Sequence, residues 1–327
     1  MDLLRRAHAR RLAAAVLVAS SAGAATLALP SIAHGFCRTT TTPIPANYSP
    51  TRGCFEDGLL LYWKGACVGY SVNSAASKGT SLEVATTVTD DAFNSWNRAT
   101  CAGGAVGVQT SNLGPVECSE VRYNPNGPNQ NVVIFRDDRW PYSDPNNTLG
   151  LTTVTFNADT GEIYDADMEI NATGKNLSTA ATVPANGFDL LSVITHEAGH
   201  FLGLAHATDA KATMFASYKP GTSALRTLTA DDTAGLCEIY PSATQRKVAT
   251  GVGITGTIAA DACDPAPRHG FGSGCTENPP PSDGGSSSGC AIGSGSTTGS
   301  GPGSGSALVV VGLALAVGAA SRRRRAR

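Results

Sequence analysis

One stretch decides the fold of this chain, His196-Glu197-Ala198-Gly199-His200-Phe201-Leu202-Gly203-Leu204-Ala205-His206. On a helix of 3.6 residues per turn, His196 and His200 lie one turn apart on the same face, with Glu197 beside them, so both imidazoles can reach one metal ion. Gly203 allows the chain to leave the helix, and His206 can then turn back as a third nitrogen ligand. Three such ligands leave the fourth position of a tetrahedral zinc ion open for water. The spacing therefore predicts a helix that carries a catalytic zinc site.

The alternative interpretation is a helix whose histidines have no role at a metal. The chain has six histidines, of which His8 and His34 lie in a segment that we expect to be removed, and three of the other four lie in this stretch. The fourth, His269, lies in a Gly/Pro-rich stretch and is expected to be solvated. Five specified positions at the required spacing are far more specific than H-E-x-x-H alone, which favours the zinc site.

The motif resembles that of the metzincin metalloproteases, which also need a methionine turn beneath the zinc. Met214, within residues 212–218, lies eight residues after His206 and is placed like that methionine. An isolated methionine is more often an ordinary core residue, so the distance from the histidines is what supports the assignment.

Further stretches resemble the matrixin branch of the metzincins. Residues 206–214 look like the matrixin zinc region, residues 228–240 are similar to the closing helix of matrixins, and residues 160–169 resemble the edge-strand region of their bacterial members. The resemblance covers residues 55–241. It implies an α/β fold, a metzincin-like zinc protease domain with a twisted, mostly parallel sheet, a catalytic helix and a C-terminal helix.

Sequence periodicity places the elements of this domain. Alternation of Val68, Tyr70 and Val72 predicts a strand, and further strands are expected at residues 132–135 and around residues 154–156. Three helices are expected, from a capping box of Thr80 and Glu83 before Val84, from Asp189 into the histidine motif, and from Thr229, Asp231 and Asp232 to Pro241.

The N-terminal segment has the composition of an export signal. Four arginines within residues 5–11 precede an apolar run at residues 12–29, and Ala33-His34-Gly35 fits cleavage by signal peptidase before Phe36. A transmembrane anchor is the alternative, and the small residues that end the run favour cleavage. We therefore expect a signal peptide at residues 1–35 and an N-terminal segment at residues 36–54, and we expect the protein to be exported.

The composition changes again after the predicted domain. Gly, Ser and Pro dominate residues 242–306, which predicts a linker. Residues 307–327 combine an apolar run with an arginine cluster, and fourteen apolar residues in a helix span about 21 Å, short of the roughly 30 Å hydrocarbon core. Together with Cys290 they resemble the C-terminal surface-sorting tails of myxobacteria, in which a Gly-Cys motif is the processing or attachment point. A short single-pass helix with cytoplasmic arginines is the alternative. Both predict attachment to a membrane or cell surface.

Nine cysteines agree with export, because paired thiols persist in an oxidising compartment. Eight of them suffice for four bridges and leave Cys290 over. The pairings that we favour are local, Cys101–Cys118 and Cys263–Cys275, although sequence does not fix connectivity. Cys37 as an inhibitory thiol is an alternative, but no segment matches the Pro-Arg-Cys-Gly switch of the family, so a plain disulfide is expected.

The charge distribution excludes one class of partner. Residues 1–35 carry +3 and residues 321–327 carry +5, which leaves about −10 for the rest of a chain whose net charge is −2. An acidic exported body argues against nucleic acid as a partner.

The strand expected at residues 163–170 carries three carboxylates on one face, Asp165, Asp167 and Glu169. Carboxylates in a row repel unless they are solvated or bound to a hard cation, and oxygen ligands suit calcium. Matrixins bind structural calcium near the equivalent strand, but we favour the alternative of a solvated face on an edge strand. The extra histidines of the second, structural zinc of matrixins are missing, so that site is not expected.

The resemblance implies a secreted or surface-attached zinc endopeptidase that acts on a protein or peptide substrate. Zinc held by three imidazoles makes its water available as a nucleophile near pH 7, and Glu197 acts as the general base. The substrate peptide is expected to lie along an edge strand. A zinc hydrolase for a non-peptide substrate and a catalytically silent adhesion protein are the alternatives, and the intact Glu197 argues against the second.

Overall fold

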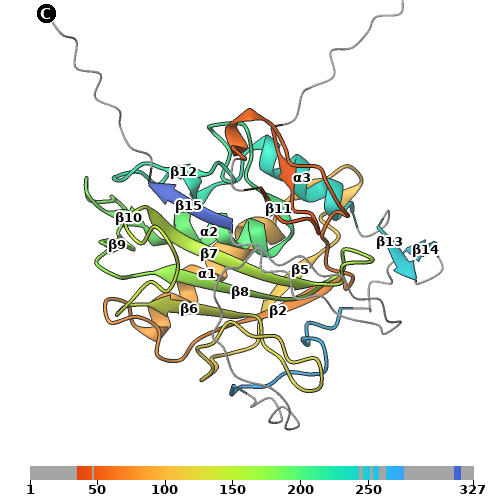
Figure 1. Cartoon of the computed structure of the whole chain (residues 1–327), viewed down its shortest axis with the longest axis horizontal. Helices are drawn as coiled ribbons and strands as arrows, with labels where there is room; N and C mark the ends of the chain where they lie inside the picture. Colours follow the sequence, from red (N-terminus) through yellow and green to blue (C-terminus); the bar gives the residue numbers. More distant parts are fainter. Residues whose placement is uncertain are drawn as a thin grey trace, which may run out of the picture. The chain divides into compact units, whose positions relative to one another are not determined.

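The computed structural model describes residues 35–45, 48–242, 246–250, 253–257, 263–275 and 313–317 (Figure 1). Residues 1–34 of the predicted signal peptide, Cys290 and the arginine cluster lie outside these residues. Within the described residues, no helix is both long enough and apolar enough to cross a membrane.

A mixed, mostly parallel sheet of five strands forms the centre of the fold, in the order β7-β8-β6-β2-β5. Strand β2 pairs in parallel with β5 and with β6, and β6 pairs in parallel with β8. Only β7 runs antiparallel to its neighbour in this set, β8. The strands are β2 (Cys67–Val72), β5 (Gln109–Asn112), β6 (Val132–Arg136), β7 (Thr148–Phe156) and β8 (Ile163–Asn171). The predicted α/β fold with a mostly parallel sheet is confirmed.

Two short strands continue this sheet beyond β7, in the order β12-β15-β7. They are β12 (Ser217–Tyr218) and β15 (Leu313–Val317). Figure 1 shows β15, in blue, lying between β12 and β7. The remaining strands form two-stranded ladders: β1 (Cys37–Arg38) with β11 (Leu204–Ala205), β3 (Thr100–Cys101) with β4 (Gly104–Ala105), β9 (Leu177–Ser178) with β10 (Phe188–Asp189), and β13 (Lys247–Thr250) with β14 (Gly253–Thr257).

Helices α1 (Leu82–Asn97) and α2 (Leu190–Phe201) pack against each other and against the sheet, and α3 (Ala230–Ile239) follows β12 and η2 in the chain (Figure 1). Two 3₁₀ turns, η1 (Pro50–Arg52) and η2 (Ala224–Arg226), complete the elements. Helix α1 begins one residue later than its predicted capping box, because Ser81 Oγ accepts from the backbone N–H of Val84. The predicted starts of the other two helices are confirmed, since Asp189 caps α2 and Thr229 caps α3.

Four disulfides link segments that are mostly far apart in the sequence: Cys37–Cys54, Cys67–Cys263, Cys101–Cys237 and Cys118–Cys275. The predicted local pairings Cys101–Cys118 and Cys263–Cys275 are wrong. Cys37 forms a plain disulfide, as expected, and is not a free inhibitory thiol. Proximity in sequence did not predict the pairing, because strands and loops bring cysteines that are far apart in the sequence together in space.

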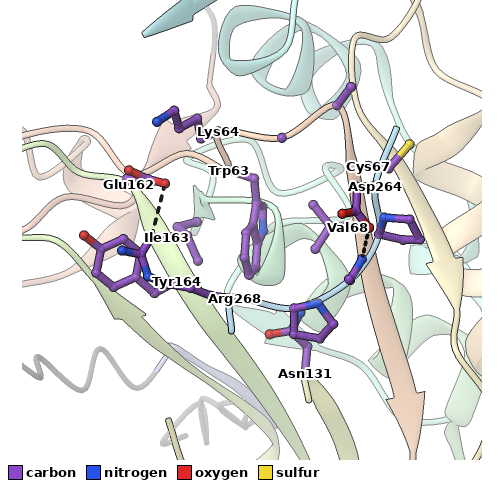
Figure 2. A pocket seen from close by; sticks show the side chains of 15 residues that line it. Trp63, Lys64, Cys67, Val68, Asn131, Glu162, Ile163, Tyr164, Asp264 and Arg268 are labelled. Atoms are coloured by element: carbon purple, nitrogen blue, oxygen red, sulfur yellow. Dashed lines mark hydrogen bonds and ion pairs between the residues drawn. The ribbon is translucent and has the colours of Figure 1, made fainter. Parts of the chain in front are cut away.

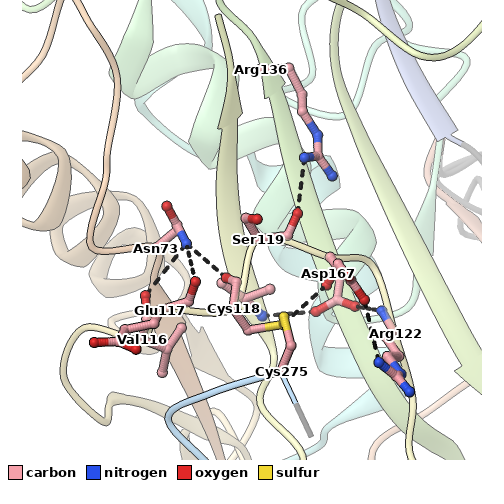
Figure 3. Close-up of a disulfide and its surroundings, with 11 residues drawn as sticks. Asn73, Val116, Glu117, Cys118, Ser119, Arg122, Arg136, Asp167 and Cys275 are labelled. Atoms are coloured by element: carbon pink, nitrogen blue, oxygen red, sulfur yellow. Dashed lines mark hydrogen bonds and ion pairs between the residues drawn. A yellow bond between two sulfur atoms is a disulfide. The ribbon is translucent and has the colours of Figure 1, made fainter. Parts of the chain in front are cut away.

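Residues 263–275 pack on the folded body, although the sequence places them in the linker. The bond Cys118–Cys275 fixes their end beside a loop in which the Asn73 amide donates to the carbonyl of Cys118 at 2.8 Å (Figure 3). Near their start, the Arg268 guanidinium lies 4.0 Å from the centre of the Tyr164 ring. These residues close one side of a cavity of about 410 Å³ that Trp63 also lines, and none of the three predicted zinc-binding histidines lines it (Figure 2).

Strand β8 is an inner strand, between β6 and β7, and all nine of its residues are buried. Asp165, Asp167 and Glu169 are therefore not on a solvated edge, and that prediction is wrong. The edge strand of the five-stranded sheet on the side of α2 is β7. Alternation of polar residues did not predict this burial, because Asp167 and Glu169 accept hydrogen bonds from protein donors in the interior.

Candidate active site

Helix α2 places His196, Glu197 and His200 in the interior, and all three residues are fully buried. The helix ends at Phe201, and Gly203 adopts φ +94°, a conformation that residues with a side chain rarely adopt. The chain then reverses through β11 and brings His206 back towards the helix. The predicted exit at a glycine is confirmed.

The three histidines converge on one point. Their potential ligand atoms all lie within 4.8 Å of one another, and no other group of three potential metal-ligating side chains converges in the described residues. His196 Nδ1 lies 2.6 Å from the carbonyl oxygen of Thr213, and His200 Nδ1 lies 2.8 Å from that of Leu204. A ring nitrogen that donates to a carbonyl leaves its Nε2 lone pair for a metal.

The Nε2 atoms of His196, His200 and His206 are buried, and none has a hydrogen-bond partner in the described part of the chain. A buried polar atom without a partner is costly, which a bound metal ion would relieve. Burial lowers the pKa of His196 to about 4. Burial and the neighbouring imidazoles of His196 and His206 lower the pKa of His200 well below its usual value. Burial, and secondly the charge of His196, lower the pKa of His206 in the same way. All three rings are therefore neutral at pH 7, as zinc ligands must be.

Strand β7 supplies two contacts to Glu197 that the sequence did not predict. The Thr152 hydroxyl donates to Glu197 Oε2 at 2.7 Å. At Gly150 a Cβ atom would lie only 2.6 Å from Glu197 Oε1, so a side chain there would collide with the carboxylate. Neither residue has a local sequence signal, because the contact depends on how β7 packs against α2.

Met214 lies directly beneath the helix that carries the histidines. It is buried, and a Cβ atom at Gly199 would lie 2.2 Å from its Sδ atom. Trp96 of α1 closes the same space, and its indole N–H donates to the carbonyl of Thr195 at 2.9 Å. Met214 is therefore a core residue that packs against α2 at Gly199, between His196 and His200.

Asp232 holds the turn that contains this methionine. It is fully buried and accepts from the backbone N–H groups of Thr213 at 2.9 Å and Met214 at 3.0 Å. It also accepts from the N–H of Thr229 in the capping box of α3. Because the Thr213 carbonyl is the partner of His196, Asp232 connects α3 to a histidine of the site. The sequence identified Asp232 only as part of a helix start.

The carboxylates of β8 lie outside the histidine cluster. Asp167 accepts from the backbone N–H of Arg122 at 2.8 Å (Figure 3). It also accepts from the backbone N–H of Val132 at 2.9 Å. Glu169 pairs with Arg136 and accepts from the Tyr142 hydroxyl. Protein donors therefore occupy both oxygens of Asp167 and of Glu169, whereas Asp165 Oδ1 is buried without a hydrogen-bond partner among the described residues.

Residues 62–241 match the family described as matrixin. The chain is 29% identical over 182 residues to matrix metalloproteinase-20 of Homo sapiens. This match covers 54% of this chain and 32% of that protein. It is 36% identical over 104 residues to metalloendoproteinase 1 of Glycine max, or 32% of each protein. A match to matrilysin of Rattus norvegicus has 31% identity over 103 residues, 32% of this chain and 35% of that protein. The matches thus span about a third of the length of these curated relatives.

Proposed function

This chain belongs to the matrixin family of metalloproteases, and we propose that it is an exported zinc endopeptidase in which His196, His200 and His206 hold the zinc and Glu197 is the general base. The observation that carries the proposal is the convergence of three buried, neutral imidazoles next to a buried carboxylate. Their unpartnered Nε2 atoms fit the nitrogen ligands of a catalytic zinc ion. When bound there, zinc would polarise the scissile carbonyl and lower the pKa of water towards 7.

The protein side chains determine where protons go. Glu197 accepts a proton from the attacking water at a carboxylate oxygen and then delivers it to the nitrogen of the leaving amine. The hydrogen bond from the Thr152 hydroxyl to Oε2 fixes the orientation of that carboxylate. Met214 and Asp232 act at a distance, since they position the helix and the Thr213 carbonyl that orient His196.

Export and surface attachment belong to the same proposal. Four disulfides among the described residues support an oxidising compartment. Cys290 lies outside the described residues and remains the proposed processing or attachment point. Cys290→Ala should leave peptidase activity intact and change the processed C-terminus or the surface retention of the protein. Identical fractionation of variant and parent, with an unprocessed chain ending at Arg327, would remove the sorting proposal.

Calcium at Asp165, Asp167 and Glu169 remains a prediction that these contacts do not support. Both oxygens of Asp167 and of Glu169 already accept hydrogen bonds from protein groups. An isothermal titration of chelator-treated protein with calcium tests it directly, and absence of heat would remove the site.

The experiment for the proposed function is digestion of casein and of a peptide library by the purified chain, with and without a zinc chelator. We expect new internal peptide termini by mass spectrometry, their loss with chelator, and their return when zinc is restored. Hydrolysis of small esters without any new peptide termini would favour a zinc hydrolase for a non-peptide substrate. Zinc-loaded protein without any hydrolysis would favour the catalytically silent surface protein.

A further inference from the structure

Strand β7 offers a backbone edge beside the proposed catalytic carboxylate. One of its edges pairs with β8, and the other faces away from the five-stranded sheet. The unused N–H and C=O groups of such an edge are a template for another extended chain. What pairs with this edge therefore determines access to the site.

In this structure the edge is paired with the chain's own C-terminal segment, β15. It runs antiparallel to β7, with Leu313 opposite Thr152, Ala314 opposite Leu151 and Ala316 opposite Thr148. The pairing shifts by an irregularity between Ala314 and Ala316. Figure 1 shows β15 between β7 and β12.

The other edge of β15 pairs with the segment that follows the methionine turn. There it runs parallel to β12, with Ala316 opposite Ser217 and Val317 opposite Tyr218. Backbone groups on both sides thus hold residues 313–317 as an inner strand. This double pairing selects an extended backbone and does not depend on particular side chains.

The paired part of β7 is also the part that contacts Glu197. The residues opposite β15 flank Gly150, whose backbone packs against the Glu197 carboxylate, and they include Thr152, which donates to it. A peptide bond that is to receive a proton from Glu197 must pass this same stretch. Substrate and β15 therefore cannot occupy it together.

We infer that residues 313–317 are an intramolecular ligand of the peptide-binding edge formed by β7 and β12, and that they compete with substrate. The inference rests on the proposed peptidase function and adds a regulation of the same site, in which an extended segment of the chain itself pairs with the edge through its backbone. The connection has ample length, because residues 276–312 lie between Cys275 and β15, and a fully extended chain of that length reaches roughly 120 Å.

The test is a full-length variant, Ala316→Pro with Val317→Pro, because Ala316 pairs with both β7 and β12 and Val317 pairs with β12. Successive N–H groups of a strand point to opposite edges, so this pair removes one donor towards each neighbour of β15. The matched control places the same two prolines at Ser304 and Gly305, outside the pairing segment. Each preparation is weighed by mass spectrometry to establish that the chain is full length.

The first readout is hydrolysis of a short fluorogenic peptide. If β15 occupies the edge nine-tenths of the time, the apparent KM falls about tenfold in the strand variant, whereas kcat stays unchanged. The control should keep the KM of the parent. Equal KM values for strand variant, control and parent would overturn the inference.

The second readout needs no turnover and separates this inference from the proposed function. In a Glu197→Gln background, hydrogen exchange of the amides in residues 148–152 should be at least tenfold faster in the strand variant than in the control. Labelled acetyl-Leu-Ala-Leu-Ala-Val-amide should also bind the strand variant more tightly. If these differences are seen and no protein cleaves peptides, the ligand assignment stands and the peptidase proposal fails. If exchange and binding are identical, the ligand assignment fails, whatever the activity.

Discussion

Replacing Gly199 by alanine tests the packing beneath the histidines. The new Cβ atom would lie 2.2 Å from Met214 Sδ and 2.8 Å from Trp96 Cζ2, both well inside van der Waals contact. Trp96 is held by its hydrogen bond to the Thr195 carbonyl, so the flexible methionine must move. Because His196 and His200 flank this position on α2, the shift occurs directly under the site.

Two opposing effects set the size of the change. Alanine is favoured over glycine inside a helix by about 1 kcal/mol, and overpacking a filled core costs about 1–3 kcal/mol. Because the new Cβ atom makes two close contacts, we place the cost of overpacking near the upper end of this range. The net loss in the free energy of unfolding is then about 1–2 kcal/mol. For a domain of this size that corresponds to a fall in Tm of roughly 2–8 °C.

The assay is thermal unfolding of the disulfide-intact protein, with Gly79→Ala as the control. A Cβ atom at Gly79 meets no atom within 4 Å, so that variant should be as stable as the parent or slightly more stable. Met214→Ala alone should lower the free energy of unfolding by about 2–5 kcal/mol. The double variant Gly199→Ala with Met214→Ala should lose less free energy of unfolding than the sum of the two single variants, because the smaller side chain leaves room for the new Cβ atom. A Gly199→Ala protein as stable as the Gly79→Ala control, or strictly additive losses, would refute the packing argument.

Three further predictions concern buried polar groups and a disulfide. Burial and the charge of Asp167 raise the pKa of Asp165, and burial raises that of Asp167 to about 7, so the folded state favours the protonated pair and its stability falls as pH rises from about 4 through 7. Asp165→Asn should therefore be about 1–3 kcal/mol more stable than the parent at pH 8 and show a flatter urea-midpoint profile against pH, and a steeper profile would contradict this. Asp232→Ala leaves the buried N–H groups of Thr213 and Met214 without their acceptor and should cost about 3–5 kcal/mol in urea unfolding, whereas a loss below 1 kcal/mol would show that they find other partners. Removing the bond Cys118–Cys275 by paired alanines should cost about 2–5 kcal/mol and make residues 263–275 accessible to limited proteolysis, and unchanged proteolysis would show that other contacts hold them.

The sequence predicted those parts of the fold that depend on local chemistry. The helix of His196 and His200, its cap at Asp189 and its exit at Gly203 follow from periodicity and backbone preference over short distances. The resemblance supplied the mostly parallel arrangement of the strands and the assignment of Met214, which no local pattern specifies.

The parts that escaped prediction depend on contacts between distant segments. The disulfide partners Cys67 and Cys263 are 196 residues apart, and the sequence around either cysteine does not indicate which cysteine pairs with it. The support of Glu197 by Thr152 requires β7 to pack on α2, and the burial of Asp167 requires backbone donors from two other segments. Alternation along β8 indicated two faces but did not show that both are covered.

The central claim is that zinc held by three histidines and a proton transferred by Glu197 hydrolyse peptide bonds. The most direct test measures zinc content and peptide turnover together in Glu197→Gln, with the exposed Glu83→Gln as a matched control. We predict one zinc per chain in both variants and in the parent, with turnover at the parental rate in Glu83→Gln and lower by several orders of magnitude in Glu197→Gln. Near-parental peptide cleavage by zinc-loaded Glu197→Gln would contradict the account.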